Sequence, residues 1–205
     1  MADLREFLAA VDDWAAGGPE EPARAHAVSL GVRTAVLLEG RSDLAAVEAL
    51  AARRGRDLAA EGVCNVPMGG AMSVGRYARL LGPAGLGLRL TGLCDEGERD
   101  FYERAFVRAQ APLRDIHVCG ADLEDELIRA LGTAEVEEIF RAEGDLRAWQ
   151  SFQRQPAQEG RPRHLQMRRF LGTKKGRKIH YGRLLVEALP PDRTPPPLDD
   201  LLTSL

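Results

Sequence analysis

Four short apolar segments alternate with amphipathic segments between residues 34 and 142, and this alternation constrains the fold more than any other feature. The apolar segments have strand length, and they lie at residues 34–38, 62–66, 88–94 and 115–119. Helices are expected after them, at residues 42–55, 73–81, 97–109, 122–131 and 134–142. Such a repeat favours a parallel sheet with right-handed crossovers. The predicted fold class is therefore α/β, with a four-stranded parallel sheet flanked by helices.

Both flanks of this region are predicted to be helical. Residues 2–16 have apolar positions at helical spacing, and a polar, alanine-rich connector follows them. Beyond residue 144 no strand-like run occurs; helices are expected at residues 146–155, 162–171 and 177–189, and a proline-rich end closes the chain. We therefore predict three parts, namely an N-terminal helical segment (1–32), an α/β domain (33–144) and a basic C-terminal helical region (145–205).

Charge is distributed unevenly, although the net charge is only -3. Residues 95–145 contain 15 acidic and 6 basic residues, whereas residues 160–186 contain 9 Lys or Arg and no acid. This division fits a metal site beside a surface that binds a polyanion, but ordinary solvated helix faces would explain each run as well.

The cysteines and the apolar runs point to an intracellular protein. Cys64, Cys94 and Cys119 lack the spacing of a metal site or a disulfide framework, so small buried thiols are expected. The chain has no signal-peptide pattern and no apolar run of membrane-spanning length. A cytoplasmic protein without a membrane partner is therefore expected.

Acidic residues follow three of the four predicted strands. Glu39 comes directly after the apolar run 35–38, and Asp43 follows at the start of a helix. In a parallel sheet the carboxyl ends of all strands meet at one edge. The remaining acids at that edge would be Asp95, Glu96, Glu98, Asp122, Glu124, Asp125 and Glu126. Converging carboxylates repel one another unless cations bridge them, and Mg²⁺ or Mn²⁺ with oxygen ligands would suit phosphoryl chemistry.

Structural explanations exist for many of these residues. Asp43, Glu96 and Glu98 would also be favourable as acids in a first helical turn, and Asp122 as a helix cap. Gly69 and Gly70 follow the second strand, where their N–H groups could hold a phosphate or simply form a turn.

Together, E-G-R-S-D at residues 39–43, G-G at 69–70, the acidic turn at Asp95 and D-L-E-D-E-L at 122–127 resemble a TOPRIM domain. Topoisomerases, bacterial primases and several nucleases share this catalytic domain. The D-L-E segment and the Lys/Arg-rich end are most similar to the TOPRIM domain of the OLD family of nucleases. The resemblance implies a TOPRIM-like (Rossmann-like) sheet that uses Mg²⁺ or Mn²⁺.

The resemblance also assigns roles to particular residues. It implies that Glu39 and Asp95 are the core of the metal site, with Asp43 at the helix start and Asp122 or, preferably, Glu124 after the fourth strand. It further implies a basic residue near the C-terminal end that stabilises charge on the scissile phosphate. Lys178 is the candidate for this catalytic role, and Lys174, Lys175 and Arg177 are expected to bind phosphate nearby.

One departure from the family pattern concerns the D-x-D turn, which reads D-E-G-E here. Gly97 stands at the second Asp position, and Glu98 could replace that acid from one residue further on. The predicted function is a metal-dependent phosphodiester hydrolase acting on DNA or RNA. A non-catalytic nucleic-acid or nucleotide binding module with a degenerate site is the alternative, and a phosphatase for small phosphoesters is a third reading.

Other TOPRIM functions fit the chain less well. The chain has no room for a separate tyrosine-bearing topoisomerase domain and no zinc-ribbon cysteines of a primase. It also has no G-x-x-x-x-G-K-[ST] motif, so ATP dependence would require a separate ATPase chain as a partner.

Overall fold

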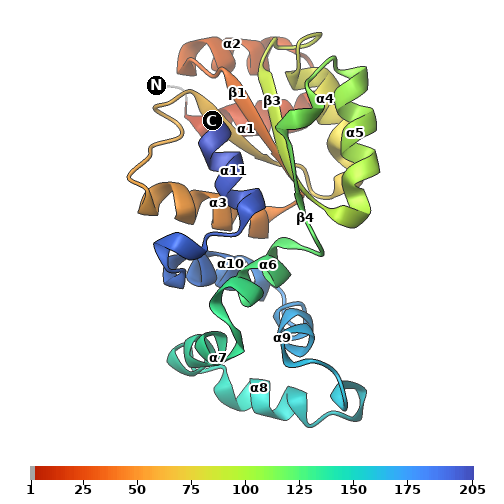
Figure 1. Cartoon of the computed structure of the whole chain (residues 1–205). Coiled ribbons are helices and arrows are strands. Elements are labelled where there is room, and N and C mark those ends of the chain that lie inside the picture. Colours follow the sequence, from red (N-terminus) through yellow and green to blue (C-terminus); the bar gives the residue numbers. More distant parts are fainter. Residues whose placement is uncertain (1–2) are drawn as a thin grey trace.

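The computed structural model describes residues 3–205, and a four-stranded parallel sheet forms the middle of the upper half of the molecule in Figure 1. The strands follow the order β2-β1-β3-β4 across the sheet. They are β1 (Thr34–Leu38), β2 (Val63–Pro67), β3 (Arg89–Asp95) and β4 (Ile116–Cys119). Every predicted strand is present with each end within one residue of the expected bound, and the predicted fold class is confirmed.

The two faces of the sheet carry separate hydrophobic cores. Val36 and Leu38 of β1 face one core, while Ala35 and Leu37 face the other, as alternation along a strand requires. The first core includes α3 (Arg41–Arg53), α10 (Arg177–Ala188) and α11 (Pro196–Ser204). The second includes α1 (Leu4–Ala15), α2 (Glu21–Leu30), α4 (Val74–Leu81) and α5 (Arg99–Arg108). All five residues of β1 are buried, because helices cover both faces.

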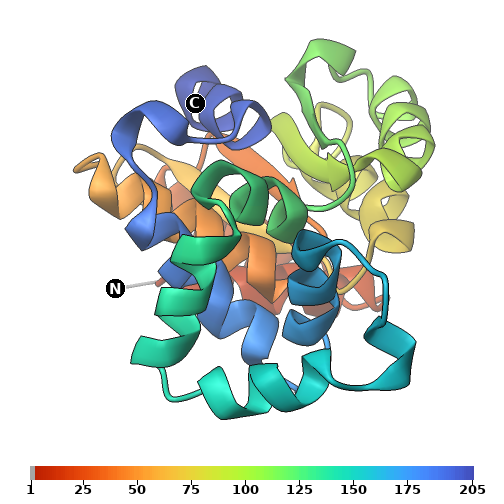
Figure 2. The ribbon, with the colours of Figure 1, turned by 60° about the horizontal axis from the view of Figure 1, so that its bottom comes forward.

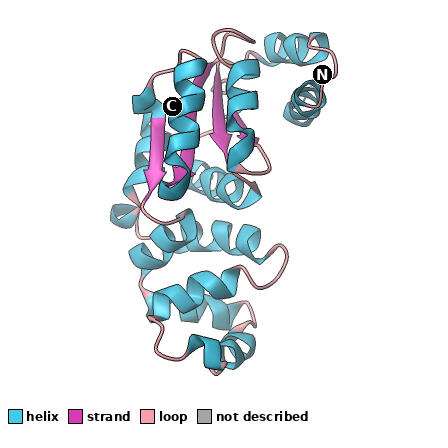
Figure 3. Ribbon diagram, turned by 90° about the vertical axis from the view of Figure 1, so that its right-hand side faces the viewer, coloured by secondary structure: helices cyan, strands magenta, loops and turns pink. Residues whose placement is uncertain are grey.

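A helical layer lies beyond the carboxyl ends of the strands, which point toward it in Figure 3. It consists of α6 (Leu123–Leu131), α7 (Thr133–Ala142), α8 (Leu146–Gln153) and α9 (Arg163–Leu171), which Figure 2 shows beside α10. Aromatic rings with centroids 5.1–6.1 Å apart hold this layer together, namely Phe140, Trp149, Phe152, Phe170 and Tyr181. Tyr181 belongs to α10, so this aromatic cluster continues into the core beneath the sheet.

The chain returns to the sheet through α10, which packs closely against α3. A Cβ on Gly182 would lie 2.9 Å from the carbonyl oxygen of Ser42, so the absence of a side chain permits this approach. Arg53 of α3 also donates to the carbonyl oxygen of Leu189, at 2.7 Å. The predicted boundary between residues 144 and 145 stays a prediction, and the packing shows that α10 and α11 cover the same face of the sheet as α3.

Two helices differ from the expectation. The connector after residue 16 contains α2, which has Pro22 in its first turn and only Ala23 and Ala27 buried, so its apolar pattern is weak. The proline-rich end forms α11, in which Pro195 precedes the helix and Pro196 begins it. Proline favours the first helical turn because its missing N–H is not needed there. Short 3₁₀ helices join other elements, at Ala71–Ser73, Glu96–Glu98, Leu113–Asp115, Pro156–Gln158 and Pro191–Arg193.

Two further sequence expectations concern the cysteines and the membrane. Cys64, Cys94 and Cys119 are buried free thiols, as predicted. Within residues 3–205, no helix combines the length and the apolar character needed to cross a bilayer.

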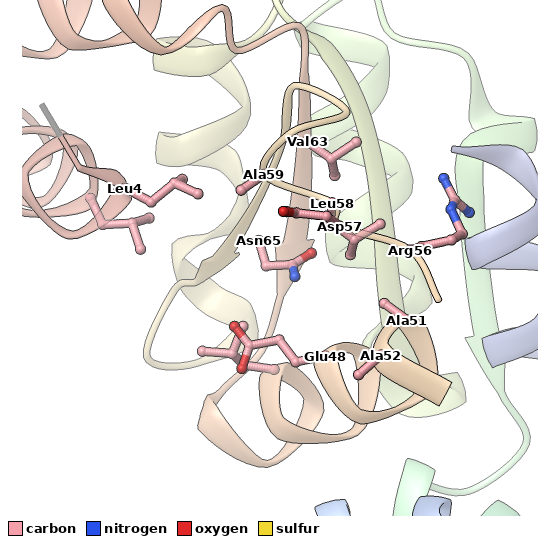
Figure 4. Close-up of a pocket in the computed structure, with 12 residues that line it drawn as sticks. Leu4, Glu48, Ala51, Ala52, Arg56, Asp57, Leu58, Ala59, Val63 and Asn65 are labelled. Carbon is pink, nitrogen blue, oxygen red and sulfur yellow. The ribbon is translucent and has the colours of Figure 1, made fainter. Parts of the chain in front are cut away.

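A cavity of about 340 Å³ opens at the edge of the sheet, between α1, α3 and β2 (Figure 4). Mostly apolar side chains line it, among them Leu8, Leu44, Leu58 and Val63. None of the residues that the sequence predicts for the site lines this cavity. The candidate site lies instead at the carboxyl edge of the sheet.

Candidate metal centre

Three carboxylates meet where β1 and β3 end. Glu39 directly follows β1, Asp95 is the last residue of β3, and Glu98 ends the short 3₁₀ helix after it. One carboxylate oxygen from each residue lies within 4.8 Å of the other two, and all three residues are half-buried. Such convergence follows from the parallel pairing of β1 with β3, which aligns their carboxyl ends.

The electrostatics of this cluster are unfavourable without a cation. Burial, together with the charges of Asp122, Glu39 and Glu98, raises the pKa of Asp95 to about 8. Burial also raises the pKa of Glu98 to about 7, together with the neighbouring Glu39 carboxyl. The Oε2 atom of Glu98 is buried without a hydrogen-bond partner among the described residues. Asp95 and Glu98 thus resist ionisation when no cation is bound, and Glu98 leaves an oxygen ligand unused.

Asp43 shapes the corner between β1 and α3. Its Oδ2 atom accepts a hydrogen bond of 2.9 Å from the backbone N–H of Gly40, the residue before the helix. Burial raises the pKa of Asp43 to about 7, and the charges of Glu124 and Glu39 also raise it, against the opposing effect of the Gly40 hydrogen bond. Asp43 is therefore both a helix-start residue and a proton-binding group near neutral pH.

A cation from α10 faces the carboxylates. Lys178 Nζ donates to Glu124 Oε2 at 3.1 Å. Glu124 is only 4% exposed, and its Oε1 atom is buried without a partner in residues 3–205. Burial raises the pKa of Glu124, with Lys178 opposing that shift. Burial lowers the pKa of Lys178, but the charge and hydrogen bond of Glu124 together with the charges of Asp122 and Asp43 outweigh burial, so the pKa lies above its usual value and the ammonium stays charged.

Together these residues enclose a cavity of about 280 Å³. The structure brings many of the sequence-predicted site residues to its wall, namely Glu39, Asp43, Gly69, Gly70, Asp95, Glu124 and Lys178. Glu98 joins them through the carboxylate cluster. Of the two acids offered for the position after β4, Glu124 is the one that lines the cavity.

The glycine pair forms the turn between β2 and the 3₁₀ helix at Ala71–Ser73. Gly70 has φ +133°, a conformation that favours glycine, and its N–H donates to the carbonyl oxygen of Glu39 at 2.9 Å. The N–H of Gly70 is thus engaged within the chain, and phosphate binding by the glycine pair stays a prediction. The observed turn fixes the backbone from which the Glu39 side chain extends.

Three sequence candidates lie elsewhere. Asp122 caps α6 by accepting from the N–H of Asp125 at 2.8 Å, and its other oxygen accepts from Arg168 at 2.6 Å. Lys174 and Lys175 are exposed in the turn between α9 and α10. None of the three lines the acidic cavity.

Arg177 has a structural position instead of the predicted phosphate-binding one. The residue is 9% exposed, and its guanidinium lies 4.0 Å from the ring centroid of Phe170. The same group donates to Thr173 at 2.8 Å and pairs with Asp145 at 3.3 Å. Its charge is thus used inside the helical layer.

Two residues that sequence reasoning missed also shape the site. Arg168 holds Asp122 in place through an ion pair. The sequence of the basic run does not indicate which of its side chains faces α6. Gly182 lies one helical turn after Lys178 and lets α10 approach α3. A glycine within a predicted helix often has a packing reason, so the close approach at Gly182 could have been predicted from the sequence.

The D-E-G-E turn has room for a side chain. Gly97 is exposed, its φ is not in the left-handed region, and a Cβ added there would meet no heavy atom within 4 Å. The fold would therefore accommodate an acidic side chain at position 97, and the second acid is missing only because this residue is glycine.

An acidic cavity at the carboxyl edge of a β2-β1-β3-β4 parallel sheet defines the class as a TOPRIM-like domain. The family model "Overcoming lysogenization defect protein-like, TOPRIM domain" matches residues 32–96. The predicted resemblance is thus confirmed for residues 32–96, which are similar to the OLD-like TOPRIM family.

Solved structures agree with this result. The chain is similar to the C-terminal region of the Xanthomonas campestris pv. campestris OLD protein, with 21% identity and a TM-score of 0.62 over 84% of this chain and 93% of that one. It is also similar to the C-terminal region of the Burkholderia pseudomallei OLD protein, with 18% identity and a TM-score of 0.60 over 84% and 96% of the two chains. At this identity the likeness shows the fold. No curated protein matches the chain.

Proposed function

We propose that the protein is a divalent-metal-dependent phosphodiester hydrolase that acts on DNA or RNA. The observation that carries this proposal is the cluster of Glu39, Asp95 and Glu98, whose carboxylate oxygens lie within 4.8 Å of one another. The OLD-like TOPRIM match over residues 32–96 supports the same reaction class.

The residues of the cluster fit Mg²⁺ or Mn²⁺. All three donors are carboxylate oxygens, the ligands that hard divalent cations prefer. The unpaired Oε2 atom of Glu98 and the raised pKa of Asp95 both indicate a site that gains stability when a cation replaces protons. Glu39, Asp95 and Glu98 would hold the ion, and a cation bound there supplies Lewis-acid activation of water and phosphate.

The surrounding residues supply the remaining chemistry. Lys178 projects a charged ammonium into the same cavity, where it can neutralise a non-bridging phosphate oxygen as charge develops. Glu124 holds Lys178 through the 3.1 Å contact. Asp43, with a pKa of about 7, can accept a proton near neutral pH. Gly40 and Gly70 fix the corner backbone on which Glu39 and Asp43 are positioned.

The experiment that tests this function is cleavage of plasmid and single-stranded nucleic acid with Mg²⁺ or Mn²⁺. Glu39→Gln preserves the shape of the side chain and removes its charge, so we expect activity to fall at least about 100-fold. Glu96→Gln is the matched control, since Glu96 is exposed, pairs with Arg99 at 3.1 Å and lies outside the cluster. Full activity in Glu39→Gln would disprove the assignment.

Gly97 motivates the second candidate, a nucleic-acid or nucleotide binding module without catalysis. The glycine removes an expected acid from the turn, and a site with fewer ligands holds a cation less tightly. Calorimetric titration separates the two functions. Absence of divalent-ion binding at millimolar concentration, with nucleic-acid affinity retained, would support the binding module.

A further inference from the structure

A basic groove of about 560 Å³ lies next to the acidic cavity, along α9 and the start of α10. We propose that this groove binds the phosphodiester backbone of the nucleic-acid strand on one side of the phosphate that occupies the acidic cavity. The proposal rests on the proposed function and adds a substrate-binding surface to it. The walls of the groove are formed by Asp122, Arg161, Leu165, Arg168, Arg169, Gly172, Thr173 and Lys178.

The charge of the groove favours a polyanion. Three arginines and one lysine line it, against one carboxylate, that of Asp122. In the part of the chain that the structure describes, the side chains of Arg161 and Arg169 make no ion pair or hydrogen bond. Two arginines without partners on one exposed wall are available to bind phosphate oxygens, for which the planar guanidinium is well suited.

Arg168 lines the groove and is held by Asp122. Its Nε atom donates to Asp122 at 2.6 Å, and that contact uses neither of its terminal nitrogens. The Asp122 pair raises the pKa of Arg168, so its positive charge is retained. The ion pair therefore orders a guanidinium whose outer edge can still donate to a ligand.

Lys178 connects the groove with the acidic cavity, because it lines both of them. A strand whose reacting phosphate lies in the acidic cavity could therefore continue past Lys178 into the groove. Contacts to phosphates position the strand and carry no base specificity. Leu165 is 37% exposed in the same groove and offers an apolar contact to a sugar or base.

The test measures binding of a fluorescent oligonucleotide in Ca²⁺ over a series of salt concentrations. The variant is Arg161→Glu with Arg169→Glu, two exposed positions whose side chains make no ion pair or hydrogen bond with the described residues. We expect the Kd to rise at least tenfold and the salt slope to fall by between about one and two, because each lost contact to a single strand removes about 0.7 from that slope. Urea denaturation of the same variant checks that it folds.

The matched control is Arg79→Glu with Arg108→Glu. These exposed arginines line a separate hollow between α4 and α5, which is lined by Gly75, Arg76 and Ala109 but by none of the acidic-site residues. The control makes the same change in net charge, so unchanged affinity would show that position and not net charge determines binding.

The outcomes separate the groove from the proposed function. An equal loss of affinity in both double variants, or unchanged affinity in the groove variant, would overturn the groove proposal even if the wild-type enzyme cleaves nucleic acid. Failure of the wild type to bind any oligonucleotide would also overturn it, and an acidic peptide competing better than the oligonucleotide would assign the groove to a protein. Absence of hydrolysis of a small phosphodiester by the wild type, with the expected loss of binding in the groove variant, would remove only the proposed function.

Discussion

Removal of the Glu39 charge should stabilise the protein in the absence of metal. Asp95 and Glu98 have folded-state pKa values of about 8 and about 7, above their ordinary values of 3.8 and 4.5. The folded state therefore binds protons that the unfolded state has released between about pH 4 and pH 8. Stability consequently falls as the pH rises through this window, by about 1.4 kcal/mol per pH unit for each such proton.

The magnitude for Glu39→Gln follows from the distances in the cluster. Two unit charges no more than 4.8 Å apart repel by at least about 3.5 kcal/mol at an effective dielectric constant of about 20. The three residues are half-buried, so solvent screening reduces this value to about 1–2 kcal/mol. We expect Glu39→Gln to be more stable than the wild type by that amount at about pH 8, and nearly equal to it at about pH 5, where Asp95 and Glu98 are protonated.

Urea denaturation followed by circular dichroism in EDTA measures this difference at several pH values. Glu96→Gln is again the control, because its carboxylate pairs with Arg99 outside the cluster. Saturating Mn²⁺ should reverse the order, since an ion that binds the folded state stabilises it in proportion to its affinity. A wild type and Glu39→Gln with parallel pH profiles in EDTA would refute the electrostatic reasoning.

Three other predictions concern single positions. Gly97→Asp should raise Mn²⁺ affinity in calorimetry, because the added side chain meets no heavy atom within 4 Å of its Cβ and brings an acid to the turn; equal affinity would show that Glu98 already completes the site. Gly182→Ala should lower the free energy of unfolding by about 1–3 kcal/mol in urea and reduce cleavage, because its Cβ would force α10 away from Ser42 and carry Lys178 with it. Arg177→Ala should cost about 2–4 kcal/mol in the same assay, since it leaves Asp145 unpaired and removes the contact with Phe170, whereas the exposed Arg183→Ala should cost less than about 1 kcal/mol; similar values for the two would contradict the buried position of Arg177.

The sheet and much of its acidic edge could be predicted from the sequence. Apolar runs of strand length gave the strands, and the shared edge of a parallel sheet brought Glu39 and Asp95 together although 55 residues separate them in sequence. Lys178 could be placed only through the family resemblance, because its approach to Glu124 depends on how α10 packs. That packing depends on the contact of Gly182 with Ser42, which no periodic pattern encodes.

The basic segment shows why charge alone did not assign roles. Arg177, Lys174 and Arg168 belong to the same run, yet the first is buried against Phe170, the second is exposed and the third pairs with Asp122. Which side chain faces which neighbour is fixed by the tertiary packing of α9 and α10. The helix at Pro196–Ser204 was missed for a different reason, since a proline run was interpreted as an end and not as a helix start.

A crystal structure of the protein soaked with Mn²⁺ tests the central claim most directly. We expect an anomalous peak between the carboxylates of Glu39, Asp95 and Glu98, whose oxygens lie within 4.8 Å of one another. The peak should be absent from crystals of Glu39→Gln treated in the same way. Wild-type crystals with no peak there, or with Mn²⁺ only at exposed acids such as Glu96, would contradict a metal centre at this edge of the sheet.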